Sequence, residues 1–111
     1  MANRDWYCED VLSGNLNVNK IWEDDLVLAF DHPNPLAEIH VVTIPKKHVP
    51  SLLSEEAKDG VLLVSMVEAI QNVARIKGLD KEGFYVRANV VAKGVTPHMH
   101  WHIIGPGIPD A

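Results

Sequence analysis

Three histidines alternate with apolar residues in one segment of the chain, which reads His98-Met99-His100-Trp101-His102. Side chains of a β-strand point alternately to the two faces of a sheet, so this spacing places the three imidazoles on one face. Met99 and Trp101 then lie on the opposite face, where they can enter a core. We therefore expect a strand that packs its Met99 and Trp101 side chains into the core and has the three imidazole rings on its opposite face.

Two kinds of chemistry use such a row of imidazoles. Histidines at alternate strand positions can ligate Zn²⁺ and leave an open position for water. Alternatively, one neutral imidazole can act as a nucleophile on phosphorus while its neighbours donate hydrogen bonds to the phosphate oxygens. Both interpretations stay open at this point, because the spacing alone does not decide between them.

The rest of the chain predicts an α+β fold in which helix covers an antiparallel sheet. We expect a short helix over residues 5–12 and a long one that starts at Ser54 as its cap, has its apolar stripe over residues 61–77 and is closed by Gly78 in a left-handed conformation. The apolar stripe of the long helix is expected to comprise Leu63, Met66, Val67, Ile70, Val73 and Ala74, with Lys77 at its exposed end. Strands are expected over residues 18–22, 26–30, 39–44, 84–91 and 98–104.

Composition limits the class of protein. A chain of 111 residues with 47% hydrophobic residues is expected to form a single domain over residues 1–111. Cys8 is the only cysteine, and no stretch has the length or apolar character of a signal peptide or membrane span, so we expect a cytoplasmic protein without membrane contact. The formal net charge of −5 argues against general binding to nucleic acid, which requires a basic face.

The segment from His98 to Ile104, HMHWHII, resembles the signature of the histidine triad family, His-φ-His-φ-His-φ-φ with φ apolar. Two further segments are similar to the family: residues 22–25, an acidic turn, and residues 28–30 followed by Ile-Pro-Lys-Lys-His at 44–48. The similarity covers roughly residues 5–105. The single short domain looks like the branch of small homodimeric members that resemble purine-nucleoside phosphoramidases.

The resemblance implies a five-stranded antiparallel sheet with one long helix, paired with a second copy. It also implies that the middle histidine, His100, attacks the α-phosphorus of a nucleotide and forms a covalent nucleotidyl-histidine that water then hydrolyses. His102 would contact the α-phosphate oxygens, while His98 and His48 would support the cluster from beside it. The implied substrate is a purine nucleoside phosphoramidate or acyl-nucleotide; the alternatives are a dinucleoside polyphosphate hydrolase and a nucleotide-binding protein with little turnover.

Nucleotide-binding residues follow from the same resemblance. Asn89 matches the family's nucleotide-contacting asparagine, and Asp31, His32 and Pro33 fall where the family places ribose and base contacts. The family usually has an acidic residue at the position of His32. The loop before the triad usually presents glutamine and a hydroxyl residue, whereas this chain has Val95 and Thr96, with the hydroxyl displaced by one residue.

Two expectations concern metal and assembly. Some histidine triad proteins hold structural zinc through an N-terminal cysteine pair and histidines; because only Cys8 is present here, we expect that site to be lost and no metal or cofactor to be bound. Leu62 and Val64 lie beside the core stripe of the long helix and add apolar surface. We therefore expect a symmetric homodimer formed through that helix and the strand around residues 84–90.

Overall fold

The computed structural model describes residues 4–109, which form one open sheet, one long helix and short helical segments. The sheet has the order β1-β2-β3-β5-β4, and every neighbouring pair is antiparallel. Its strands are β1 (Lys20–Glu23), β2 (Val27–Asp31), β3 (Ile39–Pro45), β4 (Tyr85–Ala88) and β5 (Trp101–Gly105). The helical elements are η1 (Tyr7–Leu12), η2 (Glu55–Lys58), α1 (Gly60–Lys77) and α2 (Leu79–Glu82). The predicted five-stranded antiparallel sheet with one long helix is confirmed.

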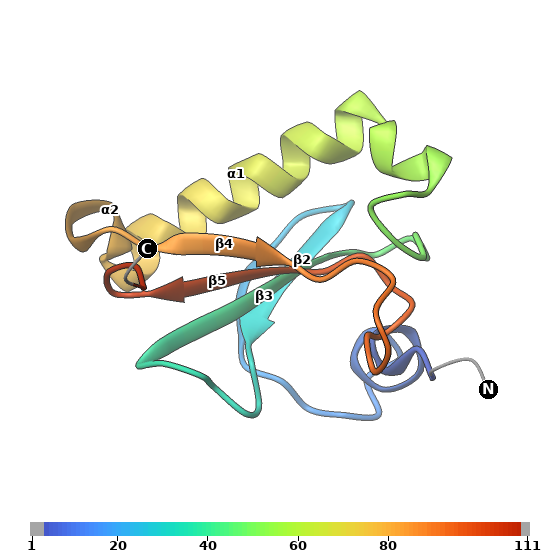
Figure 1. The fold of residues 1–111 in the computed structure, drawn as a ribbon, viewed down its shortest axis with the longest axis horizontal. Coiled ribbons are helices and arrows are strands. Elements are labelled where there is room, and N and C mark those ends of the chain that lie inside the picture. Colours follow the sequence, from blue (N-terminus) through green and yellow to red (C-terminus); the bar gives the residue numbers. More distant parts are fainter. Residues whose placement is uncertain (1–3, 110–111) are drawn as a thin grey trace.

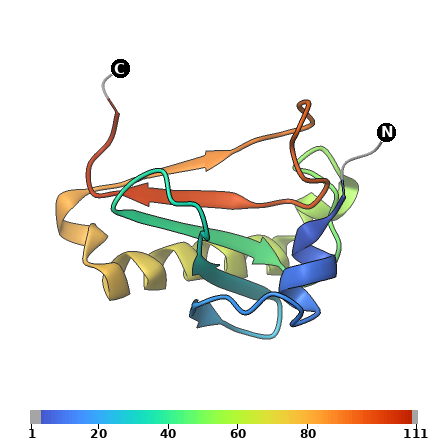
Figure 2. The same ribbon diagram turned by 90° about the horizontal axis from the view of Figure 1, so that it is seen from below.

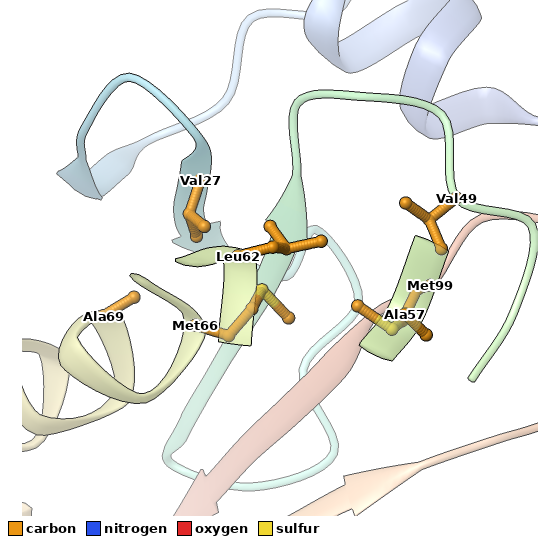
Figure 3. Close-up of a cluster of buried hydrophobic side chains, with 7 residues drawn as sticks. All are labelled: Val27, Val49, Ala57, Leu62, Met66, Ala69 and Met99. Atoms are coloured by element: carbon orange, nitrogen blue, oxygen red, sulfur yellow. The ribbon is translucent and has the colours of Figure 1, made fainter. Parts of the chain in front are cut away.

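Helix α1 runs along one face of the sheet and buries that face (Figures 1 and 2). Its inner side chains Leu62, Met66 and Ala69 pack with Val27 and Met99, together with Val49 and Ala57 from the segments between β3 and α1 (Figure 3). Farther along the helix, a second group of buried side chains continues the same layer: Ala29, Val41, Val73, Ala74, Leu79 and Ile103. This layer buries the face of the sheet that lies against α1.

The other face of the sheet is covered at one end by the N-terminal segment η1. Tyr7 and Val11 of η1 pack on Leu28 and Phe30 of β2 and on Val42 and Ile44 of β3. Strands β2 and β3 are therefore buried on both faces, which explains why residues 27–30 and 41–44 read as nearly continuous apolar runs. The uncovered part of this face is where a ligand can reach the sheet.

The limits of α1 differ from the sequence prediction. Ser54 does not cap it; instead Ser54 accepts a hydrogen bond from the Ser51 N–H, and a short 3₁₀ turn precedes the helix. Helix α1 begins at Gly60, where the Asp59 carboxylate accepts from the Val61 N–H at 3.0 Å. Gly78 ends α1 in the left-handed conformation with φ 75°, as predicted.

The buried stripe of α1 is also rotated relative to the predicted one. Leu62, expected beside the stripe, is 6% exposed, whereas Val67, expected in the stripe, is 46% exposed. The run from Val61 to Val64 is apolar all round, so periodicity does not identify its inner face. Leu62 is buried because it packs in one cluster with Val27 and Met99.

Strands β4 and β5 are shorter than predicted, because the chain leaves the ladder after Ala88 and rejoins it only at Trp101. The alternation of side chains nevertheless holds from residue 98 onward. Met99 and Ile103 enter the layer below α1, and Trp101 packs against it. The three histidines point to the other face, where His98 and His100 contact Tyr7 of η1 and His102 contacts His40.

The end of β5 lies very close to the α1–α2 side of the molecule. A Cβ atom at Gly105 would stand 2.9 Å from Leu79 Cδ2, 3.2 Å from Phe84 Cβ and 3.3 Å from the Gly83 carbonyl oxygen. The glycine is thus required for β5 to pack at this position. Over residues 4–109, no helix has the length and apolar character needed to cross a membrane.

Candidate functional site

A cleft of about 550 Å³ opens on the sheet face opposite α1. Its walls come from η1, from the loop after β2, from the loop between β4 and β5 and from β5 itself. Of these, η1 and the β4–β5 loop lie close together beside the start of β5 (Figures 1 and 2). The lining residues are Trp6, Tyr7, Leu16, His32, Pro33, Asn34, Asn89, Gly94, Val95, Thr96, His100 and His102. The volume is within the range of small-molecule sites.

His100 is held with one ring nitrogen engaged and the other left for chemistry. Its Nδ1 lies 2.6 Å from the backbone carbonyl oxygen of His98, and an imidazole nitrogen facing a carbonyl must donate a proton. The lone pair of the neutral ring is therefore on Nε2. Burial lowers the pKa of His100, and the neighbouring His98 adds to the effect while the hydrogen bond to its carbonyl opposes it. A neutral His100 at physiological pH is the form that can attack phosphorus.

His102 is oriented by His40, a residue that the sequence prediction left out of the site. The Leu36 N–H donates to Nδ1 of His40 at 3.1 Å, so the His40 proton is on Nε2. That nitrogen lies 2.8 Å from His102 Nδ1 and donates to it, which puts the proton of His102 on its own Nε2. His102 Nε2 is buried and has no partner among the described residues. The pair thus presents one fixed N–H donor at the base of the cleft.

Burial also determines the charge of this group. Burial is the largest cause that lowers the pKa of His40 to about 4 and that of His102 to about 3, and the adjacent histidines and Arg87 contribute to both shifts. His32 stacks on His40 with ring centroids 4.4 Å apart, and burial lowers its pKa as well. The Asn34 N–H donates to His32 Nδ1 at 2.9 Å, so His32 also has its remaining proton on Nε2. Near pH 7 these rings are uncharged.

His98 and His48 lie beside the rings described above, and both approach the carboxylate of Asp5. His98 Nε2 donates to the Pro45 carbonyl at 2.8 Å, while its Nδ1 is 3.0 Å from Asp5 Oδ2. His48 Nδ1 is 2.7 Å from the same carboxylate oxygen, and Cys8 Sγ is 3.3 Å from His98 Nδ1. Asp5 and Cys8 are functional candidates that the sequence prediction missed, because 90 or more residues separate them from His98.

Tyr7 joins the two histidine groups through ring contacts. Its ring centroid lies 5.0 Å from that of His100 and 5.7 Å from that of His98. Burial and the nearby charge of Asp5 raise the pKa of the Tyr7 phenol, which stays protonated. Nothing in the sequence pattern distinguished Tyr7 from an ordinary core residue.

The structure brings most of the predicted nucleotide contacts to the cleft. His32, Pro33, Asn89, Val95 and Thr96 all line it.

Asp31 does not line this cleft. Its carboxylate accepts from the Asn19 side-chain amide at 2.6 Å and lies 3.3 Å from Lys77 Nζ, beside a neighbouring hollow that also borders His32 and Pro33. Among the described residues, the cleft lining therefore contains no carboxylate and no lysine or arginine. Polar contact there depends on uncharged donors and acceptors.

A second hollow, of about 340 Å³, lies on the other side of the β4–β5 loop. It is formed by residues 50–52, 88–92 and 95–101, and it shares Asn89, Val95, Thr96 and His100 with the first cleft. His100 thus stands where the two hollows meet.

The triad does not form one metal-binding face. Two groups of described residues have ligand atoms within 4.8 Å of one another: one combines Asp5, Cys8, His48 and His98, and the other combines His32, His40 and His102. His98 and His102 belong to different groups, and His100 belongs to neither. The arrangement favours the interpretation of His100 as a nucleophile over that of a zinc site shared by the three.

Comparison with known families agrees with this arrangement. The family model described as HIT domain matches residues 13–107, which is most of the chain. The chain belongs to the histidine triad (HIT) family. The match includes the Ile-Pro-Lys-Lys-His segment at 44–48 and all three triad histidines.

Solved structures and relatives in sequence also belong to this family. A histidine triad protein from Clostridium difficile superposes with a TM-score of 0.85 at 34% identity, covering 100% of this chain and 99% of that one. A HIT family hydrolase from Legionella pneumophila gives a TM-score of 0.83 at 28% identity, with 96% and 95% covered. Adenylylsulfatase HINT3 of Arabidopsis thaliana is 34% identical over 101 residues, which are 88% of this chain and 50% of that protein.

Proposed function

We propose that this HIT protein hydrolyses a purine nucleoside phosphoramidate or acyl-nucleotide at the α-phosphate and releases the nucleoside monophosphate. The observation that carries the proposal is the bond from His100 Nδ1 to the His98 carbonyl at 2.6 Å, which leaves the Nε2 lone pair free beside a cleft of nucleotide size. A neutral imidazole at a fixed angle is a competent nucleophile.

The reaction has two displacements at phosphorus. His100 Nε2 attacks the α-phosphorus, a P–N bond to the imidazole forms, and the bond from phosphorus to the leaving amine or acyl oxygen breaks. Water then attacks the same phosphorus, the P–N bond to His100 breaks, and the nucleoside monophosphate departs. The two protons of that water end on the products, so His100 returns to its neutral state.

The surrounding groups suit a phosphate that gains negative charge as it is attacked. His102 Nε2–H is a buried donor without a partner among residues 4–109, and a buried unpaired donor costs about 1–3 kcal/mol until an acceptor reaches it. A small shift of the ring would let it donate to an α-phosphate oxygen. The described residues that line the cleft include no carboxylate that would repel such a ligand.

The nucleoside is proposed to occupy the larger cleft. His32 Nε2–H lies there as a donor for ribose hydroxyls, in place of the acidic residue usual in the family, and Trp6, Pro33 and Asn89 border the same space. The leaving group would depart through the second hollow, since both hollows reach His100.

Names of relatives support the reaction class. The Legionella structure is described as a hydrolase, and the Arabidopsis relative is named an adenylylsulfatase. Because this chain spans half of that relative, we take from it the adenylyl class alone.

Intact-mass analysis after incubation with an adenosine phosphoramidate tests the proposal. The expected result is a protein whose mass increases by one adenylyl group and a solution that accumulates AMP, with both lost in His100→Ala. Faster AMP formation from a dinucleoside polyphosphate would instead favour the polyphosphate hydrolase. Tight AMP binding without adduct or turnover would identify a binding protein and overturn the hydrolase proposal.

A further inference from the structure

Arg87 lies directly beside His102, on the neighbouring strand of the sheet. Strand β4 is the edge strand next to β5, and Arg87 pairs with His102 across the antiparallel ladder (Figure 1). Residues that are directly opposite each other in such a ladder point their side chains to the same face. Val86 pairs with Ile103, which belongs to the layer beneath α1. Arg87 is therefore on the opposite face, where His102 borders the cleft.

The guanidinium of Arg87 has no counter-ion among residues 4–109. Arg87 is half-buried, and its Nε is shielded from solvent without a hydrogen-bond partner in this part of the chain. The formal net charge is −5, so acidic side chains are plentiful, and Arg4 and Lys77 each pair with one. A partly buried cation without an anion is unfavourable, because nothing offsets its desolvation. The position of Arg87 therefore favours an anion that comes from outside the chain.

The rings that lie near Arg87 carry no charge of their own at neutral pH. Burial is the larger cause of this, and the positive charge of Arg87 also lowers the pKa of His40, His100 and His102. Neutral rings offer a phosphate only their N–H dipoles, and the described residues that line the cleft include no lysine or arginine. Neighbouring strands are about 4.8 Å apart, which is less than the length of an extended arginine side chain. The guanidinium can therefore extend over His102 toward the cleft.

We propose that Arg87 binds the phosphate of the nucleotide from the β4 side of the cleft and is the cation of the site. The inference rests on the proposed function for the identity of its ligand, a nucleotide with a 5′-phosphate. His102 Nε2–H, which is buried and unpaired among the described residues, donates to one phosphate oxygen. The guanidinium of Arg87 donates to a second oxygen, and its planar fork suits the geometry of a phosphate group.

This arrangement assigns charge and nucleophilicity to different side chains. A protonated histidine attracts phosphate but has no lone pair with which to attack phosphorus. Arg87 stays charged at every physiological pH, so the site attracts the anion while His100 remains neutral. Negative charge on the phosphate oxygens is then opposed by a fixed cation throughout the displacement.

Equilibrium binding of AMP and of adenosine tests the proposal without measuring turnover. Adenosine has the same base and sugar but no phosphate, so its affinity reports any general damage to the cleft. In Arg87→Met the Kd of AMP should rise by about tenfold, while the Kd of adenosine stays unchanged. Arg87→Lys should fall between the wild type and Arg87→Met, because it keeps the charge and loses the fork. Added salt should weaken AMP binding more in the wild type than in Arg87→Met.

Two further variants show whether the effect is specific to Arg87. Arg75→Met is the matched control, because Arg75 is exposed on α1 and its loss changes the net charge equally. It should leave the Kd of AMP and of adenosine unchanged. His100→Ala should lose the adenylyl adduct and keep the tight binding of AMP, so the inference and the proposed function can fail separately.

Inorganic phosphate is the second probe in the same variants, and it should also bind the wild type more tightly than Arg87→Met. Equal affinities of the wild type and Arg87→Met for both AMP and phosphate would overturn the assignment. So would a wild type that binds neither probe. An equal loss of AMP and adenosine affinity in Arg87→Met would show that Arg87 only supports the fold.

Discussion

His40 Nε2 lies 2.8 Å from His102 Nδ1, and the two buried rings form one hydrogen-bonded unit. Because the Leu36 N–H fixes the proton of His40 on Nε2, the tautomer of His102 is fixed through His40 and not by solvent. His40 thus acts on the candidate phosphate donor from behind, without lining the cleft itself.

Replacing His40 is expected to reduce turnover through His102. In His40→Leu the ring of His102 loses its partner and can present either nitrogen to the cleft, so kcat should fall by about 10²-fold, the typical effect of losing one positioned donor. His40→Gln can still accept from Leu36 N–H and donate to His102, and should retain more activity. Steady-state kinetics compare the two, and equal loss in both variants would argue against tautomer control.

A contrast between neighbouring residues tests the two faces of β5. Trp101→Ala removes an aromatic ring that packs toward α1, and should lower the free energy of unfolding by up to about 3 kcal/mol, less than for a fully buried ring. His100→Ala should abolish adduct formation while the protein still folds and binds AMP. Denaturant unfolding and mass analysis measure the two effects. A stable Trp101→Ala protein with impaired chemistry would mean that the faces are assigned wrongly.

Stability is expected to fall with acidification before most carboxylates titrate. His40 and His102 have folded-state pKa values of about 4 and about 3, below the ordinary value near 6.5, so between these limits the unfolded chain binds more protons. Their contribution is present above pH 6.5 and is lost as the pH falls toward 4, with a slope of at most about 1.4 kcal/mol per pH unit for each ring.

Urea unfolding between pH 6.5 and 5 measures this slope. The double variant with His40→Gln and His102→Gln should flatten it, because neither glutamine titrates. A steep slope in the double variant would assign the effect to other groups.

Two glycine-to-alanine substitutions should have opposite effects. Gly105→Ala places a Cβ 2.9 Å from Leu79 Cδ2 and 3.3 Å from a backbone oxygen, and we expect a loss of about 1–3 kcal/mol from overpacking. Gly60→Ala meets no atom within 4 Å at the first residue of α1, and should be neutral or stabilising by up to about 1 kcal/mol. Thermal and urea unfolding compare both, and a harmless Gly105→Ala would contradict the close approach.

We predict a symmetric homodimer through α1 and β4. Strand β4 is at the edge of the sheet, and Val86 on it and Val64 on α1 are 43% and 58% exposed. Light scattering at micromolar concentration should give twice the chain mass, and Val86→Lys should shift it toward monomer. Leu36→Lys, at an exposed leucine in the β2–β3 loop, is the control. A wild-type monomer would exclude the dimer.

The sequence predicted those features that depend on local periodicity. The two-residue period of residues 98–102 placed the histidines and Trp101 on opposite faces, because alternation is a property of the extended chain itself. The buried face of α1 could be predicted less well from the sequence, because Leu62 and Leu63 are equally apolar. Only contacts with other elements determine which of the two is buried.

Long-range register determined the rest of the site. His40 reaches His102 because Val42 pairs with His102 across β3 and β5, so the residue two places earlier lies diagonally beside it. His40, Val42 and Ile44 alternate, which was a usable signal once the strand order was known. Asp5 offered no such signal, because it meets His98 across 93 residues of chain.

That separation gives the N-terminal segment a particular thermodynamic role. The contacts of Asp5 and Cys8 with His98 span 90 or more residues, and the buried clusters beneath α1 contain no residue of η1, so we predict that η1 opens independently of that layer. A ligand that bridges η1 and the triad stabilises only the attached state, in proportion to its affinity. Amide hydrogen exchange in residues 7–12 should therefore slow when AMP binds, while exchange in the middle of α1 stays nearly constant. The opening equilibrium of η1 is thus expected to report whether the cleft that Tyr7 lines is occupied.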